Sequence, residues 1–183
     1  ASKVYDGTAL TESGYTYTGT LASGDSLEVT IVGTITNVGT VVNEITQVKV
    51  MNGTTDVTAN YNITEVDGSL EITKAPVTIT AASENFTYDG SPHSNAGYDV
   101  VGLVGSDAIT AVVEGTITYP TESPVVNEVK SHSFTTGLAG NYDVSYVNGS
   151  LTMDTASIDL TVTADNASKV YDGTALTESG YTY

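Results

Sequence analysis

The chain has 183 residues, no cysteine, and 22 Asp plus Glu against five Lys, for a net charge of −17. Without cysteine, no disulfide and no thiolate metal site can form. The acidic balance argues against nucleic acid and anionic membrane surfaces as partners, because both require Lys and Arg, and no apolar run is long enough for membrane insertion.

An internal repeat organises the chain. Residues 1–17 return letter for letter as residues 167–183, and a Tyr-Asp-Gly motif recurs at steps of 88 − 5 = 83 and 171 − 88 = 83. The motif residues are Tyr5, Asp6, Gly7, Tyr88, Asp89, Gly90, Tyr171, Asp172 and Gly173. We expect three segments: an incomplete unit, 1–74, that lacks its first strand, a complete unit, 75–157, and the first strands of a next unit, 158–183. The chain is thus predicted to be a window on a longer array.

The first unit shows the two-residue periodicity of strands. Along 26–35, Leu27, Val29 and Ile31 share one face with polar residues between them, which is typical of an antiparallel sheet with one buried face. Further on, 61–66 and 69–73 flank Asp67-Gly68, which predicts a hairpin with a type I′ turn.

The second unit repeats this order. Val77, Ile79 and Ala81 alternate with threonines, and a second hairpin is predicted where 142–147 and 150–153 flank Asn148-Gly149. No stretch predicts a helix, and frequent turn residues imply roughly seven short strands per unit. The predicted fold class is therefore all-β: a tandem array of small immunoglobulin-like β-sandwich repeats of about 83 residues, with β-grasp-like sheets as the alternative.

Tyrosines near the end of each unit support the sandwich. The segments 56–63 and 138–144 resemble the tyrosine corner of immunoglobulin domains, with Tyr61 and Tyr142 at the corner position. In that corner the tyrosine hydroxyl bonds back to the backbone.

The third segment opens with the strand that the first unit lacks. Leu160, Val162 and Ala164 alternate with threonines in Ile158–Ala164. In a continuous array the preceding repeat supplies this strand to each unit. In a polymer of separate subunits a neighbour would donate it by β-strand addition. The continuous array is the preferred interpretation.

Few residues suggest chemistry. The Tyr-Asp-Gly motif fits a structural turn better than a recognition loop. His93 and His132 correspond to apolar residues in the other unit, so packing is expected rather than metal binding. No catalytic, cofactor-binding or metal-binding residue is predicted, and no serine hydrolase motif occurs. Calcium at acidic turns is the alternative considered, and its candidate ligands are Glu84, Asp154, Asp159 and Asp165. Candidate N-glycosylation sites are Asn52, Asn62, Asn85, Asn148 and Asn166.

The spacing of these motifs resembles a known family. Residues 4–8 together with 60–73, and 86–90 together with 141–151, are similar to the MBG/YDG repeats of bacterial cell-surface adhesins. The resemblance implies an extracellular stalk or spacer module without enzymatic activity, whose partners are neighbouring repeats of the same chain or polymer.

A second function class remains open from the sequence. An adhesin module would bind carbohydrate or a host or partner protein through exposed aromatic side chains. The candidates for such a cluster are Tyr15, Tyr17, Tyr98 and Tyr119. The composition, with 31 Thr and 17 Ser, suits exposed strands of an extracellular protein in either case.

Overall fold

The structure, a computed structural model, describes all 183 residues and consists of strands and three short 3-10 turns. The prediction of an all-β chain is confirmed. The strands are β1 (Ser2–Val4), β2 (Asp25–Val32), β3 (Gly39–Asn52), β4 (Thr55–Asp56), β5 (Gly68–Thr73), β6 (Ala75–Ala81), β7 (Glu84–Thr87), β8 (Tyr98–Val101), β9 (Ala108–Glu114), β10 (Val125–Thr136), β11 (Tyr142–Val147), β12 (Gly149–Asp154), β13 (Thr163–Ala164) and β14 (Tyr181–Thr182). The 3-10 turns are η1 (Thr58–Asn60), η2 (Pro120–Glu122) and η3 (Ala139–Asn141). No helix has the length and apolar character needed to cross a membrane.

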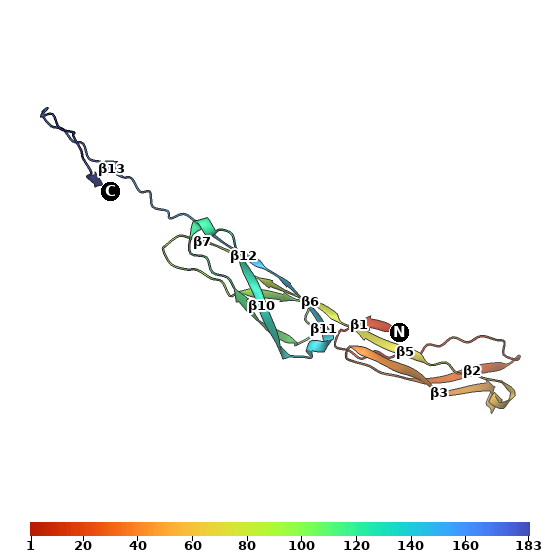
Figure 1. Cartoon of the computed structure of the whole chain (residues 1–183). Coiled ribbons are helices and arrows are strands. Elements are labelled where there is room, and N and C mark those ends of the chain that lie inside the picture. Colours follow the sequence, from red (N-terminus) through yellow and green to blue (C-terminus); the bar gives the residue numbers. More distant parts are fainter.

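The molecule is long and narrow (Figure 1). Strands β1–β5 form one end, strands β6–β12 form the middle, and residues 158–183 extend from the far end as a thin tail. We call residues 1–74 the first unit and residues 75–157 the second unit. Only Lys74 separates β5 from β6, so the chain passes between the units without a linker.

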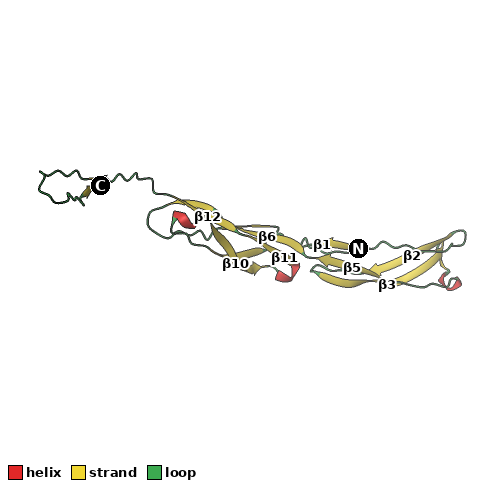
Figure 2. Ribbon diagram, turned by 45° about the horizontal axis from the view of Figure 1, so that its top comes forward, coloured by secondary structure: helices red, strands yellow, loops and turns green.

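The first unit is a single sheet. Its strands lie in the order β1-β5-β3-β2, and β4 pairs with the end of β3. The long strand β3 holds the sheet together, because its first residues pair with β5 and the rest pair with β2. Figure 2 shows this sheet beside the more compact second unit.

The second unit contains the same sheet and a further one. Strands β7-β12-β10-β9 correspond to β1-β5-β3-β2, and three additional strands form the sheet β11-β6-β8. The main apolar core lies between these two sheets, with Val77 and Ile79 of β6 fully buried against Ile109, Val113 and Val129 of β9 and β10. The apolar alternation of β6 is thus explained by a face that is completely removed from water.

The antiparallel pairing expected for 26–35 is confirmed between β2 and β3, but three other strand pairs are parallel. β1 pairs with β5, β7 with β12, and β6 with β11 in parallel. Immunoglobulin domains consist of two antiparallel sheets, and these parallel pairs are a difference from that topology. Periodicity could not reveal the direction, because a strand with one buried face alternates in the same way in either case.

The two predicted hairpins are also wrong. β11 lies in one sheet of the second unit and β12 in the other, and 61–66 is not paired with β5. A type I′ turn needs positive φ at both central residues, and neither Gly68 nor Gly149 has a positive φ. Instead, the Asp67 and Asn148 side chains accept the backbone N–H of Ile45 and Val129. In the second unit, Asn148 lies where the chain passes from the sheet of β11 to the sheet of β12.

The C-terminal segment 158–183 contains one short pairing. β13 and β14 are antiparallel, with Thr163 opposite Thr182 and Ala164 opposite Tyr181. β6 and β8 pair in the same register 83 residues earlier, with Thr80 opposite Asp99 and Ala81 opposite Tyr98. The segment therefore repeats the opening arrangement of the second unit.

Candidate functional site

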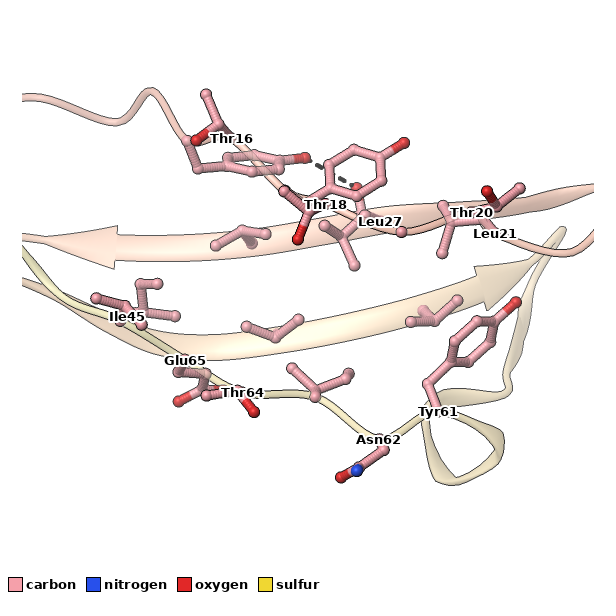
Figure 3. A pocket seen from close by; sticks show the side chains of 18 residues that line it. Thr16, Thr18, Thr20, Leu21, Leu27, Ile45, Tyr61, Asn62, Thr64 and Glu65 are labelled. Atoms are coloured by element: carbon pink, nitrogen blue, oxygen red, sulfur yellow. Dashed lines mark hydrogen bonds between the residues drawn. The ribbon is translucent and has the colours of Figure 1, made fainter.

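The first unit has an open groove of about 600 Å³ on its surface. Its floor is the inner face of β2 and β3, which contributes Leu27, Val29 and Ile45. One wall is the segment 15–21 and the other is 61–66. Figure 3 shows Thr16 to Leu21 along one side, Tyr61 to Glu65 along the other, and Leu27 and Ile45 between them.

Both walls of the groove carry unpaired backbone. Neither 15–18 nor 62–66 belongs to a strand, and neither takes part in a backbone–backbone hydrogen bond. The corresponding segments of the second unit are β8 and β11, which are paired on both sides of β6. Unpaired backbone N–H and C=O groups beside an apolar floor can pair with an added strand.

The groove leaves the first unit with less core. Thirteen of the 17 buried residues belong to the second unit and four, Asn43, Val50, Leu70 and Ile72, to the first. Leu27 and Val29 are only partly buried, whereas Ile109, the counterpart of Leu27 at a step of 82, is buried. The apolar floor is therefore partly open to solvent.

A tyrosine closes one end of each unit. The Tyr61 hydroxyl accepts the N–H of Ala22 at 2.9 Å and donates to Oδ2 of Asp25 at 2.6 Å. This hydrogen bond to Asp25 raises the pKa of Tyr61 and lowers that of Asp25. The backbone partner lies 39 residues upstream, whereas in the immunoglobulin corner it lies a few residues upstream. The bond thus ties 61–66 to the loop before β2.

Tyr142 makes the equivalent contacts in the second unit. Its hydroxyl donates to Oδ2 of Asp107 at 2.6 Å and accepts the N–H of Val104 at 3.2 Å. Burial, followed by this hydrogen bond, raises the pKa of Tyr142 to about 12. Sequence reasoning did not single out Asp25 and Asp107, although their recurrence at a step of 82 just before or at the start of a strand was a usable signal.

The Tyr-Asp-Gly motifs are turns. Oδ1 of Asp6 accepts the backbone N–H of Thr8 at 2.9 Å and the ammonium of Lys3 at 2.8 Å, and these bonds hold its pKa well below the usual range. Gly7 follows with a φ of 79°, a left-handed conformation that favours glycine.

The other two motifs have the same geometry. Asp89 and Asp172 accept the backbone N–H of the residue two positions ahead, at 2.8 Å and 3.0 Å. Bonds from Lys169 and Thr174 lower the pKa of Asp172 to about 2. Gly90 and Gly173 also have positive φ. In each motif the Asp and Gly thus form a turn, and the Tyr directly precedes it.

The first motif also forms the junction between the units. The ring of Tyr5 packs edge-on against that of Tyr142, with centroids 5.5 Å apart at 82°, and Tyr5 lies against the core of the second unit. Nearby, the buried Asn141 side chain accepts the N–H of Val38 at 2.9 Å and donates to Asn37 at 3.0 Å. These contacts fix one unit against the other.

Both histidines lie partly buried against aromatic rings. His93 stacks on Phe86 with centroids 4.7 Å apart and hydrogen-bonds to Asp89. His132 packs edge-on against Phe134 and Tyr146. These are the packing positions that the apolar counterparts in the first unit predicted. The structure contains no group of three or more His, Asp or Glu side chains arranged to hold a metal ion, so Glu84, Asp154, Asp159 and Asp165 are not brought together.

The four candidate tyrosines do not form one cluster. Tyr15 and Tyr17 line the groove, and Tyr98 packs against the core of the second unit. Tyr119 lies next to η2, with its ring centroid 6.3 Å from that of Tyr88. The five candidate glycosylation sites are all exposed: Asn52, Asn62, Asn85, Asn148 and Asn166. Asn62 belongs to the wall of the groove.

Comparison with family models, with curated proteins and with solved structures gave no match.

Proposed function

We propose that this chain is a structural repeat of an extracellular stalk or filament, which acts as a semi-rigid spacer and carries out no catalysis. In this proposal a unit with all of its strands, such as the second unit with its two sheets, is a small immunoglobulin-like sandwich. The partners of a unit are its neighbours in the array. The resemblance to the MBG/YDG repeats of surface adhesins and the Thr- and Ser-rich, acidic composition support an extracellular location.

The observation that carries the proposal is the junction between the units. A single residue, Lys74, joins β5 to β6, so the connection has almost no slack. Tyr5 packs on Tyr142, and Asn141 bridges to the loop before β3. Domains joined by flexible linkers move independently, whereas a short connection with packed and hydrogen-bonded contacts transmits orientation from one unit to the next.

Nothing in the structure requires a reaction. The lining of the groove consists mainly of apolar, Thr and Tyr side chains, with Asn62 and with Glu65 as the single carboxylate. The predicted adhesive surface needs clustered exposed tyrosines, and the four candidates lie at three separate places. The spacer function therefore fits the geometry better than an adhesive site built from these tyrosines.

The experiment measures the rigidity of the junction. The chain has no cysteine, so cysteines introduced at the exposed positions Thr30 of β2 and Thr110 of β9 can be spin-labelled specifically. Pulsed electron paramagnetic resonance then gives the distribution of distances between the two labels, one on each unit. We expect a narrow distribution for the otherwise unchanged chain. Asn141→Ala removes both hydrogen bonds across the junction and should broaden the distribution.

Asn60→Ala is the matched control. Asn60 corresponds to Asn141 at a step of 81 but is exposed and makes no side-chain hydrogen bond, so its loss should leave the distances unchanged. A broad distribution in the parent chain, or equal effects of the two substitutions, would contradict the spacer function.

A further inference from the structure

The groove of the first unit lies where the second unit holds its central strand. In the second unit, β6 is hydrogen-bonded to β11 on one side and to β8 on the other. The corresponding segments of the first unit are 61–66, at a step of 81, and 15–18, at a step of 83. These segments are the two walls of the groove (Figure 3). The groove thus has the floor and the unpaired walls of an acceptor for one strand.

A buried amide of the first unit lacks a partner that its counterpart has. Nδ2 of the fully buried Asn127 donates to the carbonyls of Ala82, just after β6, and Asn95, both at 2.8 Å. Asn43 corresponds to Asn127 at a step of 84 and is 6% exposed, but it donates only to the carbonyl of Glu12. Buried N–H groups are almost always paired, so an acceptor is missing where the chain after a central strand would pass.

A glycine points to the same missing chain. A Cβ at Gly149 would lie 2.1 Å from the carbonyl oxygen of Ala82, so the passage of the chain after β6 requires glycine there. At Gly68, its counterpart at a step of 81, the nearest atom would be 3.6 Å away on Asn43. Neither glycine has a positive φ. The first unit therefore keeps open a space that none of residues 1–183 fills.

Segment Ile158–Ala164 has the properties of the missing strand. It corresponds to β6 at a step of 83 and has the same alternation. Ile158, Leu160 and Val162 are 83%, 76% and 58% exposed, whereas the residues at the corresponding positions of β6 are at most 4% exposed. A row of exposed apolar side chains on one face of a strand indicates a surface that is covered in the assembled protein.

The edge pairing of this segment also matches the groove. β13 pairs with Tyr181 and Thr182 in the register that joins β6 to β8. Residues 181–183 repeat residues 15–17 letter for letter. The wall 15–18 therefore offers the strand the same partner residues in the same register, and can replace β14.

We propose that the groove of the first unit binds the strand Ile158–Ala164 of a second copy of this chain, so that copies join head to tail. The strand runs parallel to 61–66, with Leu160 beside Ile63, and antiparallel to 15–18, with Val162 beside Tyr17. This register is that of β6 between β11 and β8. The inference rests on the proposed stalk function. In place of the continuous array preferred from the sequence, it has a neighbouring copy donate the strand that joins the array.

Side-chain sizes favour this pairing. In the second unit, Phe134 stacks on Tyr142 at 5.2 Å, and Tyr142 pairs with the small Ala75. In the first unit the counterpart of Phe134 is Val50, while the strand would bring the larger Ile158 to the position of Ala75. A smaller residue on the floor of the groove is thus combined with a larger strand residue, which keeps the packed volume similar.

The ends of the molecule allow the contact to repeat. The groove lies at one end and the strand at the other (Figure 1), so one copy cannot satisfy both from within itself. A contact between two different surfaces that does not close on itself generates a filament.

Two variants of the full chain each keep one half of the contact. Gly68→Ala keeps the strand but places a methyl group where the chain after the bound strand must pass. Leu160→Asp combined with Val162→Asp keeps the groove but puts charge on the inward face of the strand. Gly140→Ala is the control, because a Cβ there meets no atom within 4 Å.

Peptide binding and sedimentation velocity give the readouts. A synthetic peptide of residues 157–166 should bind the Leu160→Asp/Val162→Asp chain with one peptide per chain, and the Gly68→Ala chain at least about tenfold more weakly. The parent and Gly140→Ala chains should form oligomers that lengthen with concentration. Each blocked variant should remain monomeric, and their equimolar mixture should stop at a dimer.

Three results would overturn the proposal. These are no peptide binding at about 1 mM, equal binding by the Gly68→Ala chain, and a parent chain that stays monomeric at the same concentration. None of them bears on the spacer function, which the label distances measure at the junction between the first and second units of a single chain.

Discussion

The hydroxyl of Tyr142 ties β11 to the loop before β9 by donating to Asp107 at 2.6 Å while accepting the backbone N–H of Val104 at 3.2 Å. Tyr142 is 2% exposed, so water cannot replace these partners. Tyr142→Phe should lower the free energy of unfolding by about 1–3 kcal/mol, because it leaves a partly buried N–H and a carboxylate without their partner. Urea denaturation followed by circular dichroism measures this loss.

Tyr171→Phe is the control for that substitution. Tyr171 is 92% exposed, and its hydroxyl makes no hydrogen bond within the chain, so the midpoint of unfolding should not move. An equal shift for both variants would show that the loss at Tyr142 does not come from its buried hydrogen bonds.

The same tyrosine makes stability depend on alkaline pH. Burial and the bond to Asp107 raise the pKa of Tyr142 to about 12, whereas an unfolded tyrosine titrates near 10. Since the folded pKa is the higher one, this stabilisation is fully present below about pH 10 and is lost as pH rises toward about 12. The free energy of unfolding should fall over this range, and it should fall less steeply in Tyr142→Phe. Urea denaturation at several pH values between about 10 and 12 measures the free energy of unfolding of both chains. If it fell equally steeply with pH in the parent chain and in Tyr142→Phe, the prediction would be contradicted.

The junction predicts unequal effects at two equivalent glycines. Gly7 and Gly90 have φ values of 79° and 86°, so replacing either by alanine should cost about 1–2 kcal/mol in backbone strain. At Gly7 the new Cβ also lies 3.1 Å from Cγ1 of Val104 in the second unit, whereas at Gly90 it meets nothing within 4 Å. Gly7→Ala should therefore destabilise more, and it should broaden the distance distribution between units, while Gly90→Ala should not. Thermal unfolding and the spin-label distances measure the two effects.

The repeat carried most of what could be predicted from the sequence. The alternation of Val77, Ile79 and Ala81 correctly predicted a strand with one buried face, and the whole of β6 is buried on that face. The strand that the first unit was expected to lack is the one that we propose the groove accepts. These inferences need only the alternation of apolar and polar residues within a single strand. That alternation can be read from neighbouring residues, and it recurs in the corresponding strands of the other units.

Pairing partners could not be predicted in the same way. Asp67-Gly68 and Asn148-Gly149 look like hairpin turns because their residue types tolerate positive φ. Their actual roles depend on distant chain: the side chains accept the N–H of Ile45 and Val129, and Gly149 makes room for Ala82. The junction was missed for the same reason, because Tyr5 and Tyr142 are 137 residues apart (142 − 5) and meet only when both units are folded.

Gly149 and Gly68 allow a direct comparison between the second unit, where β6 occupies the strand site, and the first unit, where the groove is open. Gly149→Ala would place Cβ 2.1 Å from the carbonyl oxygen of Ala82 and within 2.7 Å of that of Ala81, so β6 or β12 must move. We expect a loss of about 3 kcal/mol, as for an overpacked core. Gly68→Ala meets only Asn43 at 3.6 Å, and should change the stability of the free chain by less than about 0.5 kcal/mol.

Urea denaturation of the two variants at low protein concentration, where chains are separate, measures this difference. Because neither glycine has a positive φ, backbone strain cannot account for it, and the presence of β6 in one unit alone remains as the cause. Equal losses at both positions would mean that Gly68 is already constrained in the free chain, and that the groove is closed in solution.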